Sequence, residues 1–313
     1  MSSSLFTTSE DTNGFTSHPI TDLDGGTGPE AVLSSTNSID FPSTGNYLLS
    51  TVNKTATGFS YTDAGPAITN GTIYIGPNGA DQKGTAKLID SGDVRLSSDV
   101  IQRGGKIYSI QTVADPTSGK SDLHYAIFDA ATKTLITDGL ISDPNLNYYY
   151  GSLSVNKFGD IVIGMSGSGA PAGTFGGQYA SAYSVVGKFD GTTAKFGSAF
   201  VIQQGLGKYE TTSDPNPNST TSSVRWGDWS QTTVDPNDPY SFWTAQEYAT
   251  GVTLAQATAT KPVVDQWAVR LVNINLTPVP ETSTFVSGGA GFLGLGLLLL
   301  TARKRRRVAG SAE

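Results

Sequence analysis

Short runs in which hydrophobic and polar residues alternate predict β-strands along most of this chain. The alternation is clearest in the middle of the sequence, where 107–113 and 124–129 change polarity at almost every step. No window before residue 285 shows a sustained 3.6-residue period, so we expect an all-β fold there. The predicted strands are 47–52, 72–75, 99–102, 107–113, 124–129, 134–139, 148–155, 161–166, 182–189, 226–234, 241–248 and 267–274.

Turn residues separate these runs and give them a repeated order. Gly104-Gly105 is typical of a two-residue hairpin turn, and Asx-rich turns that begin at Asn156 and Asp235 each join two predicted strands. Repeats of roughly 40 to 80 residues built from short antiparallel strands are typical of β-propeller blades. The pattern therefore predicts a β-propeller-like domain of the six- or seven-bladed type over residues 30–276.

A continuous apolar run over 285–302 ends at a basic cluster near the end of the sequence. As a helix rising ~1.5 Å per residue it would span roughly 27 Å, close to the ~30 Å hydrocarbon core of a bilayer. Clustered basic residues remain in the cytoplasm, so we expect a single transmembrane helix with 303–313 as its cytoplasmic tail and an exported body before it. The stop-transfer residues are Arg303, Lys304, Arg305, Arg306 and Arg307.

The segment before this run, 277–284, is predicted to be a linker that carries a sorting motif. Val279, Pro280, Glu281 and Thr282, followed by a Ser/Thr stretch, a Gly/Leu-rich span and the Arg cluster, resemble a PEP-CTERM sorting signal of Gram-negative bacteria. Thr282 stands where that signal usually has a second proline. The resemblance implies an inner-membrane, single-pass intermediate, an exosortase-like processing enzyme as partner, and release to the cell surface or extracellular matrix.

The first 29 residues are polar and show no sustained period, so we expect a disordered lead-in. They contain neither a basic n-region nor an apolar h-region of a secretory signal. A sorting tail that requires export conflicts with a chain that lacks an export signal. We therefore expect the natural chain to begin further upstream, with a signal peptide and further blades.

Composition narrows the classes of partner. Five of the 20 basic residues lie in 303–307 while the whole chain has a net charge of −7, so the body is strongly acidic and we expect no nucleic-acid partner. The chain has no Cys and only two His, which excludes thiolate sites and sites built on several histidines. We predict neither a metal site nor a cofactor.

Two stretches, 151–169 and 225–249, resemble the blades of exported bacterial sialidase-like β-propellers. In those blades an Asn/Asp-x-x-Gly-Asp turn joins two inner strands, as Asn156 to Asp160 does in this sequence. The resemblance implies a propeller fold. It implies no single activity, because propellers host hydrolases, lyases and binding modules alike.

Polar and aromatic residues gather around the last predicted hairpin, where ligands would meet the ends of inner strands. The candidate ligand-binding residues are Arg225, Asp228, Trp229, Trp243, Gln246 and Glu247. A structural interpretation, which the pattern favours, is that Trp226, Trp229 and Trp243 pack between blades while Arg225 pairs with Asp228 or Glu247. No catalytic residue is assigned.

Two functions remain open at this stage. The first is a non-catalytic envelope or matrix protein whose domain binds extracellular polysaccharide or surface proteins. The alternative is a polysaccharide-active enzyme, a glycoside hydrolase or lyase on a sialidase-like propeller, in which Glu247 would be required for turnover.

Overall fold

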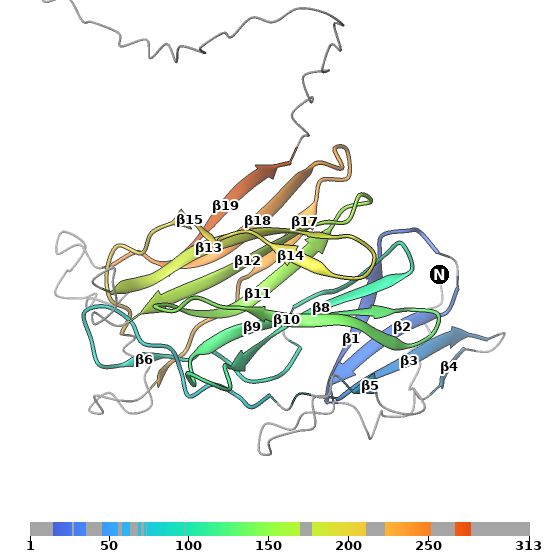
Figure 1. Ribbon diagram of the computed structural model, residues 1–313, viewed down its shortest axis with the longest axis horizontal. Helices are drawn as coiled ribbons and strands as arrows, with labels where there is room; N and C mark the ends of the chain where they lie inside the picture. The colour runs from blue at the N-terminus through green and yellow to red at the C-terminus, as the bar shows by residue number, and fades with distance from the viewer. Residues whose placement is uncertain are drawn as a thin grey trace, which may run out of the picture. The chain divides into compact units, whose positions relative to one another are not determined.

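The computed structural model is all-β in every part that it describes (Figure 1). The chain divides into two units, 1–277 and 278–313, and all described residues belong to the first. Among them the structure contains strands and no helix. The described residues are 15–26, 28–35, 46–55, 58–62, 68–69, 72, 74–96, 98–169, 177–210, 223–251 and 267–276.

The largest sheet has nine strands: β1 (Phe15–Asp22), β2 (Glu30–Ser35), β3 (Asn46–Lys54), β4 (Phe59–Thr62), β5 (Ile68–Thr69), β7 (Val100–Arg103), β8 (Lys106–Ala114), β9 (Ser121–Asp129) and β10 (Thr134–Ile141). Their order is β10-β9-β8-β7-β1-β2-β3-β4, with β5 paired to β3. Gly104 and Gly105, with φ angles of 61° and 67°, form the tight turn that pairs Arg103 with Lys106. This turn agrees with the sequence prediction, because a two-residue hairpin of this type needs positive φ at both positions.

The second sheet contains β11 (Asn147–Val155), β12 (Asp160–Gly169), β13 (Gln178–Phe189), β14 (Ala194–Phe196) and β15 (Phe200–Gln203). The third sheet contains β17 (Gln231–Val234), β18 (Ser241–Ala249) and β19 (Trp267–Asn275), and a small parallel pair joins β6 (Leu88–Ile89) to β16 (Ser223–Val224). The side chain of Asn156 fixes the β11–β12 turn, since its Oδ1 accepts the N–H groups of Phe158 and Asp160 at 2.9 Å each.

The second sheet packs between the other two in chain order (Figure 1). Ile110 and Leu123 of the first sheet share a core cluster with Leu153 of the second. On the other face of the second sheet, Val162 meets Phe242 and Ile274 of the third. Alternation along β11 and β12 thus supplies two buried faces, which is why almost every residue of both strands is buried.

The first strand corrects the predicted lead-in of residues 1–29. Phe15–Asp22 forms β1, and Ile20 is buried in a core cluster with Leu33, Leu49 and Phe128. β1 pairs with β2 in the antiparallel sense and with β7 in the parallel sense, with Ile20 opposite Val100. These polar residues are ordered by long-range pairing, which a local sequence pattern does not reveal.

Two further predicted strands differ from the structure. The described residues of 72–75 are not part of a strand, although Tyr74 is buried with Val94 and Val113. In 226–234 only Gln231–Val234 is a strand, and the residues before it form an irregular segment. Trp226 and Gly227 of that segment line a hollow instead of pairing in a sheet.

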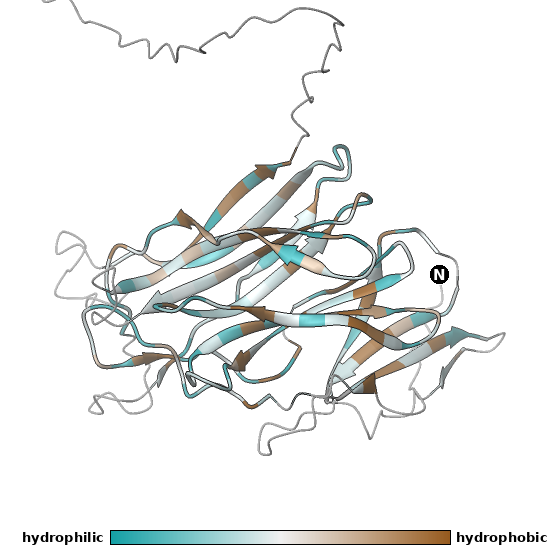
Figure 2. Ribbon diagram, viewed as in Figure 1, coloured by the Kyte–Doolittle hydropathy of each residue, from teal (hydrophilic) through white to brown (hydrophobic). Residues whose placement is uncertain are grey.

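The described residues do not all divide into separate blades. The order β11-β12-β13-β14 is that of an up-and-down meander, whereas the first sheet joins nine strands through the β1–β7 pair. Part of the outer face of the third sheet is open among the described residues: β19 carries hydrophobic residues (Figure 2), and Leu271 is 61 % exposed, whereas Glu247 on the same face is buried.

The predicted linker, transmembrane run and basic tail lie outside the described residues, as do Val279 to Thr282 and Arg303 to Arg307. Within the part of the chain that the structure describes, no helix is long and apolar enough to cross a membrane.

Candidate functional site

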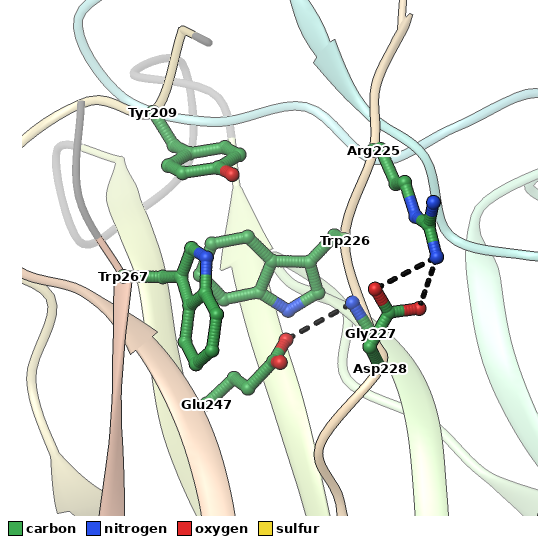
Figure 3. A pocket seen from close by; sticks show the side chains of 7 residues that line it. All are labelled: Tyr209, Arg225, Trp226, Gly227, Asp228, Glu247 and Trp267. Atoms are coloured by element: carbon green, nitrogen blue, oxygen red, sulfur yellow. Dashed lines mark hydrogen bonds and ion pairs between the residues drawn. The ribbon is translucent and has the colours of Figure 1, made fainter. Parts of the chain in front are cut away.

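A hollow of about 180 Å³ lies where the irregular segment after β16 crosses the ends of β18 and β19. Antiparallel pairing sets Ala249 opposite Trp267 and Glu247 opposite Val269, so Glu247 and Trp267 share one face of the third sheet. Figure 3 shows the side chains that surround the hollow. They belong to Tyr209, Arg225, Trp226, Gly227, Asp228, Glu247 and Trp267.

Glu247 holds the irregular segment in place. The residue is only 3 % exposed, and its Oε2 accepts the N–H of Gly227 at 3.0 Å. Burial raises the pKa of Glu247 and the charge of Asp228 raises it further, while the backbone N–H groups of Gly227 and Trp229 lower it. The carboxyl group therefore positions the backbone that carries Trp229.

Trp226 forms the floor of the site. It is 4 % exposed, and its Nε1–H donates to Ser166 Oγ at 3.0 Å. Its ring meets that of Tyr209 edge to face, with centroids 4.9 Å apart and planes at 82°. The predicted packing role of Trp226 is confirmed, since it belongs to a core cluster that also contains Tyr149 and Ala249.

Trp229 and Trp267 form an exposed aromatic pair. Their ring centroids are 6.4 Å apart with an interplanar angle of 21°, and they are 58 % and 44 % exposed. The structural interpretation of the sequence, in which Trp229 packs between blades, is therefore wrong for this residue. Large aromatic rings left in contact with water are typical of binding surfaces.

Arg225 and Asp228 form an ion pair at the rim. Arg225 Nη2 donates to Asp228 Oδ1 at 2.9 Å, and the two side chains are 79 % and 52 % exposed (Figure 3). This carboxylate raises the pKa of Arg225. An ion pair this exposed adds little to stability, so its donors and acceptors remain available to a polar ligand.

The structure separates Gln246 and Trp243 from the other candidate residues. Gln246 is fully buried on the opposite face of β18, where its Nε2 donates to Ser152 Oγ and Thr244 Oγ1 at 2.9 Å each. Trp243 shares the face of Glu247 but lies four residues away, about 13 Å along the strand, and its Nε1–H donates to Asp235 Oδ2 at 3.0 Å. Trp243 is 38 % exposed, so the predicted packing between blades is wrong for it.

Sequence reasoning missed Tyr209 and Trp267 as site residues. Trp267 is the first residue of a predicted strand, and its place opposite Ala249 could have been found by aligning the two alternating patterns. Tyr209 lies in an irregular segment with no periodic signal. In the described part of the chain, no group of three or more His, Asp or Glu side chains is placed to hold a metal ion.

Comparisons with known proteins give little similarity. No family model matches the chain, and no curated protein matches its sequence. A solved structure of a beta-fructofuranosidase mutant from Microbacterium saccharophilum K-1 aligns with 55 % of this chain at 16 % identity and a TM-score of 0.31. The alignment spans 42 % of that enzyme's chain, less than half its length. At this level it identifies neither a family nor an activity for this chain.

Proposed function

We propose that this chain is an exported envelope or matrix protein whose β domain binds polysaccharide at the hollow beside Trp229 and Trp267. The observation that carries the proposal is the exposed, nearly parallel tryptophan pair next to an exposed Arg225–Asp228 ion pair. The apolar C–H face of a sugar ring packs on an indole, while its hydroxyl groups need donors and acceptors of the kind this ion pair offers.

The tail supports the exported location in this proposal. An apolar run at 285–302, the basic cluster after it and the motif at 279–282 together favour transient anchoring in the inner membrane and processing by an exosortase-like enzyme. Release to the cell surface would bring the domain to extracellular polysaccharide, its proposed partner.

A propeller-like architecture is part of the same proposal. The four-stranded meander β11-β12-β13-β14 has the order of a single blade, and the three larger sheets follow one another in chain order. The six- or seven-bladed form remains a prediction.

Affinity electrophoresis of the full chain through gels that contain soluble neutral polysaccharides tests the binding function. We expect Trp229→Ala and Trp267→Ala each to weaken retardation by about 2- to 10-fold, as the loss of one aromatic contact implies. Phe158→Ala is the matched control, because Phe158 is 39 % exposed and stacks on Tyr240 at the opposite end of β11. Equal retardation of all three variants and the parent would refute the proposed site.

A glycoside hydrolase is the second candidate, and one observation favours it. Glu247 has a raised pKa because of burial, while Asp228 is exposed and paired with Arg225, so two carboxyl groups of one site have different environments. Such a division accompanies acid and nucleophile roles in glycosidases. If the chain releases reducing sugar and Glu247→Gln abolishes that release without loss of binding, the enzymatic function replaces the binding one.

A further inference from the structure

We propose that a second hollow, lined by Asp93, Arg95, Thr112 and Tyr150, is a second subsite for the same ligand, and that this ligand is a chain of neutral sugars. The inference rests on the proposed polysaccharide-binding function and names its ligand class. The second hollow measures about 210 Å³, and its lining residue Tyr150 contacts Gly227, which lines the first.

Tyr150 joins the two hollows through a pair of glycines. One edge of its ring, with Cγ, Cδ2 and Cε2, faces Gly227 of the first hollow. Cε1, Cζ and the hydroxyl group face Gly92 of the second, about 3.3 Å from where a Cβ would lie. Tyr150, which lines the second hollow, therefore packs directly against Gly227, which lines the first.

The backbone at Tyr150 is held in an unusual conformation. Its φ is 49°, and the register between β11 and β12 shifts between Tyr149 and Ser152, which marks a bulge. The Tyr150 N–H donates to Thr112 Oγ1 at 3.1 Å, so the buried wall of the second hollow fixes this conformation. Positive φ at a bulky residue costs free energy, and bulges that redirect a side chain are frequent beside binding sites.

The two hollows carry matching polar groups. In the second, Arg95 Nε donates to Asp93 Oδ1 at 2.7 Å, as Arg225 donates to Asp228 in the first. The side chains of Arg95 and Asp93 are 44 % and 17 % exposed. Each pair offers guanidinium donors and carboxylate acceptors, which is the combination that sugar hydroxyl groups require.

Charge selects neutral sugars over acidic ones. Burial raises the pKa of the Tyr150 phenol most, and Asp90, Asp93 and Asp228 raise it further while Arg95 lowers it, so negative charge predominates near this hydroxyl group. Arg95 and Arg225 supply only two positive charges, and both are already paired. A uronate or sulfate ester would meet net negative charge, whereas a neutral sugar needs no counter-charge.

Size indicates a ligand with several units. Each hollow is smaller than the ~300–1,000 Å³ typical of pockets that enclose a whole drug-sized ligand. A single sugar fills at most one of them. A linear chain that crosses the contact between Gly227 and Tyr150 reaches both, so affinity should grow with chain length until both are occupied.

Calorimetric titration of the full chain with neutral oligosaccharides of one to six units, from mannan, xylan and β-glucan, tests the proposal beside polygalacturonate oligomers. We expect the parent to gain about tenfold in affinity between short and long oligomers of one neutral series, and to bind polygalacturonate at no length. Arg95→Gln and Tyr150→Phe should each reduce that gain, and Arg95→Gln should leave the affinity for the shortest bound oligomer unchanged. Lys188→Gln, which breaks the exposed pair with Asp160 elsewhere on the second sheet, is the control and should change neither value.

The outcomes separate the two proposals. If short oligomers bind and need Trp229 but affinity does not grow with length, or if Arg95→Gln leaves the gain intact, the second subsite is overturned and the first remains. Binding of polygalacturonate as tight as that of neutral oligomers overturns the assignment to neutral sugars. If no oligomer of any series binds the parent, the polysaccharide-binding function falls together with the second subsite.

Discussion

Gly227 is subject to two separate constraints. Its φ is 96°, and a Cβ there would lie 2.3 Å from Cδ2 of Tyr150. Gly191 shares the first constraint, with φ of 104°, but has open space around its missing Cβ. Alanine substitutions at Gly227 and Gly191 therefore allow the free-energy cost of backbone strain to be separated from that of steric overlap.

We expect Gly191→Ala to lower the free energy of unfolding by about 1 kcal/mol and Gly227→Ala to lower it by roughly 1–3 kcal/mol more, since a Cβ at Gly227 would overlap the Tyr150 ring. Urea unfolding followed by tryptophan fluorescence measures both. Equal losses in the two variants would show that the Tyr150 ring yields, and that its contact with Gly227 is not rigid.

Asp122 is a buried acid whose ionisation opposes folding. It is 1 % exposed, its Oδ1 has no hydrogen-bond partner among the described residues, and burial raises its pKa from 3.8 to about 7, with Asp115 and Asp143 adding to the rise and Lys120 reducing it. Between pH 4 and 7 the folded protein keeps a proton that the unfolded chain has released. The stability contributed by this proton is complete below pH 4 and is lost as pH rises through 7.

We therefore expect Asp122→Asn to be more stable than the parent at pH 8, by about 1–2 kcal/mol after screening, and similar to it at pH 4. Denaturant unfolding at a series of pH values measures this. The stability contributed by Asp190 should have the opposite pH dependence, and Asp190→Asn should remove it. N–H and hydroxyl groups of Thr193 and Thr192 lower the pKa of Asp190, so the stability that its carboxylate contributes to the fold is lost as pH falls. A parallel pH dependence in Asp122→Asn and the parent would contradict the assignment.

Local sequence order made part of the site predictable. Arg225 and Asp228 are three residues apart, and their predicted ion pair is present in the structure. Gln246 and Glu247 are neighbours on a strand, so alternation already placed only one of them on the face of the hollow. Tyr150 and Arg95 could not be assigned, because they reach the site through a bulge and an irregular segment that come from other parts of the chain.

The contact between the second and third sheets is polar where β11, β17 and β18 meet. Thr232 Oγ1 lies 2.9 Å from Ser152 Oγ and 2.9 Å from Thr244 Oγ1, and Gln246 Nε2 donates to both Ser152 and Thr244. Gly164 opposes them, because a Cβ there would approach Thr244 Oγ1 to 2.2 Å. The hydroxyl groups thus fill a narrow space between sheets that no larger side chain fits.

Thr244→Val keeps the shape of the side chain but removes the hydroxyl that links Thr232 to Gln246. We expect a loss of about 1–3 kcal/mol in the free energy of unfolding, because buried partners are left without a hydrogen bond. Thr233→Val on the exposed face of β17 is the control, with an expected change within about 0.5 kcal/mol. Chemical denaturation measures the free energy of unfolding of both variants. Equally small losses in the two would mean that the hydrogen-bond network does not stabilise the fold.

Strands were predictable from sequence where both of their neighbours are close in the chain. β8 to β10 and β11 to β13 follow the alternating runs, because each pairs with the next strand through a short connection or hairpin. β1 was missed because its Thr, Ser and His residues lack a hydrophobic period, and it is ordered by pairing with β7 about 80 residues later. The nine-stranded sheet, and with it the departure from separate blades, follows from that one parallel pair.

The open outer face of the third sheet connects the architecture with the proposed function. Trp267, Val269 and Leu271 alternate along β19 on that face and are all more than 40 % exposed. In a propeller such a face meets the next sheet. In the described part of this chain Val269 and Leu271 instead continue the exposed hydrophobic surface that begins at Trp267.

The apolar run at 285–302 gives the last prediction, which concerns the chain as a whole. Its hydrophobicity rests mainly on Leu297 to Leu300, because five glycines lie before them over 288–296 and glycine contributes little to transfer into lipid. We expect the full chain to float with phospholipid vesicles in a density gradient, and replacement of Leu297, Leu298, Leu299 and Leu300 by serine to abolish flotation. Leu271→Ser is the control, since Leu271 belongs to the exposed face of β19 and its replacement should leave flotation unchanged.

Flotation lost in the control but kept in the tail variant would move the membrane contact from the tail to the β domain. The proposal of a sorting tail would then fail, while the tryptophan site would remain to be judged by its own binding measurements.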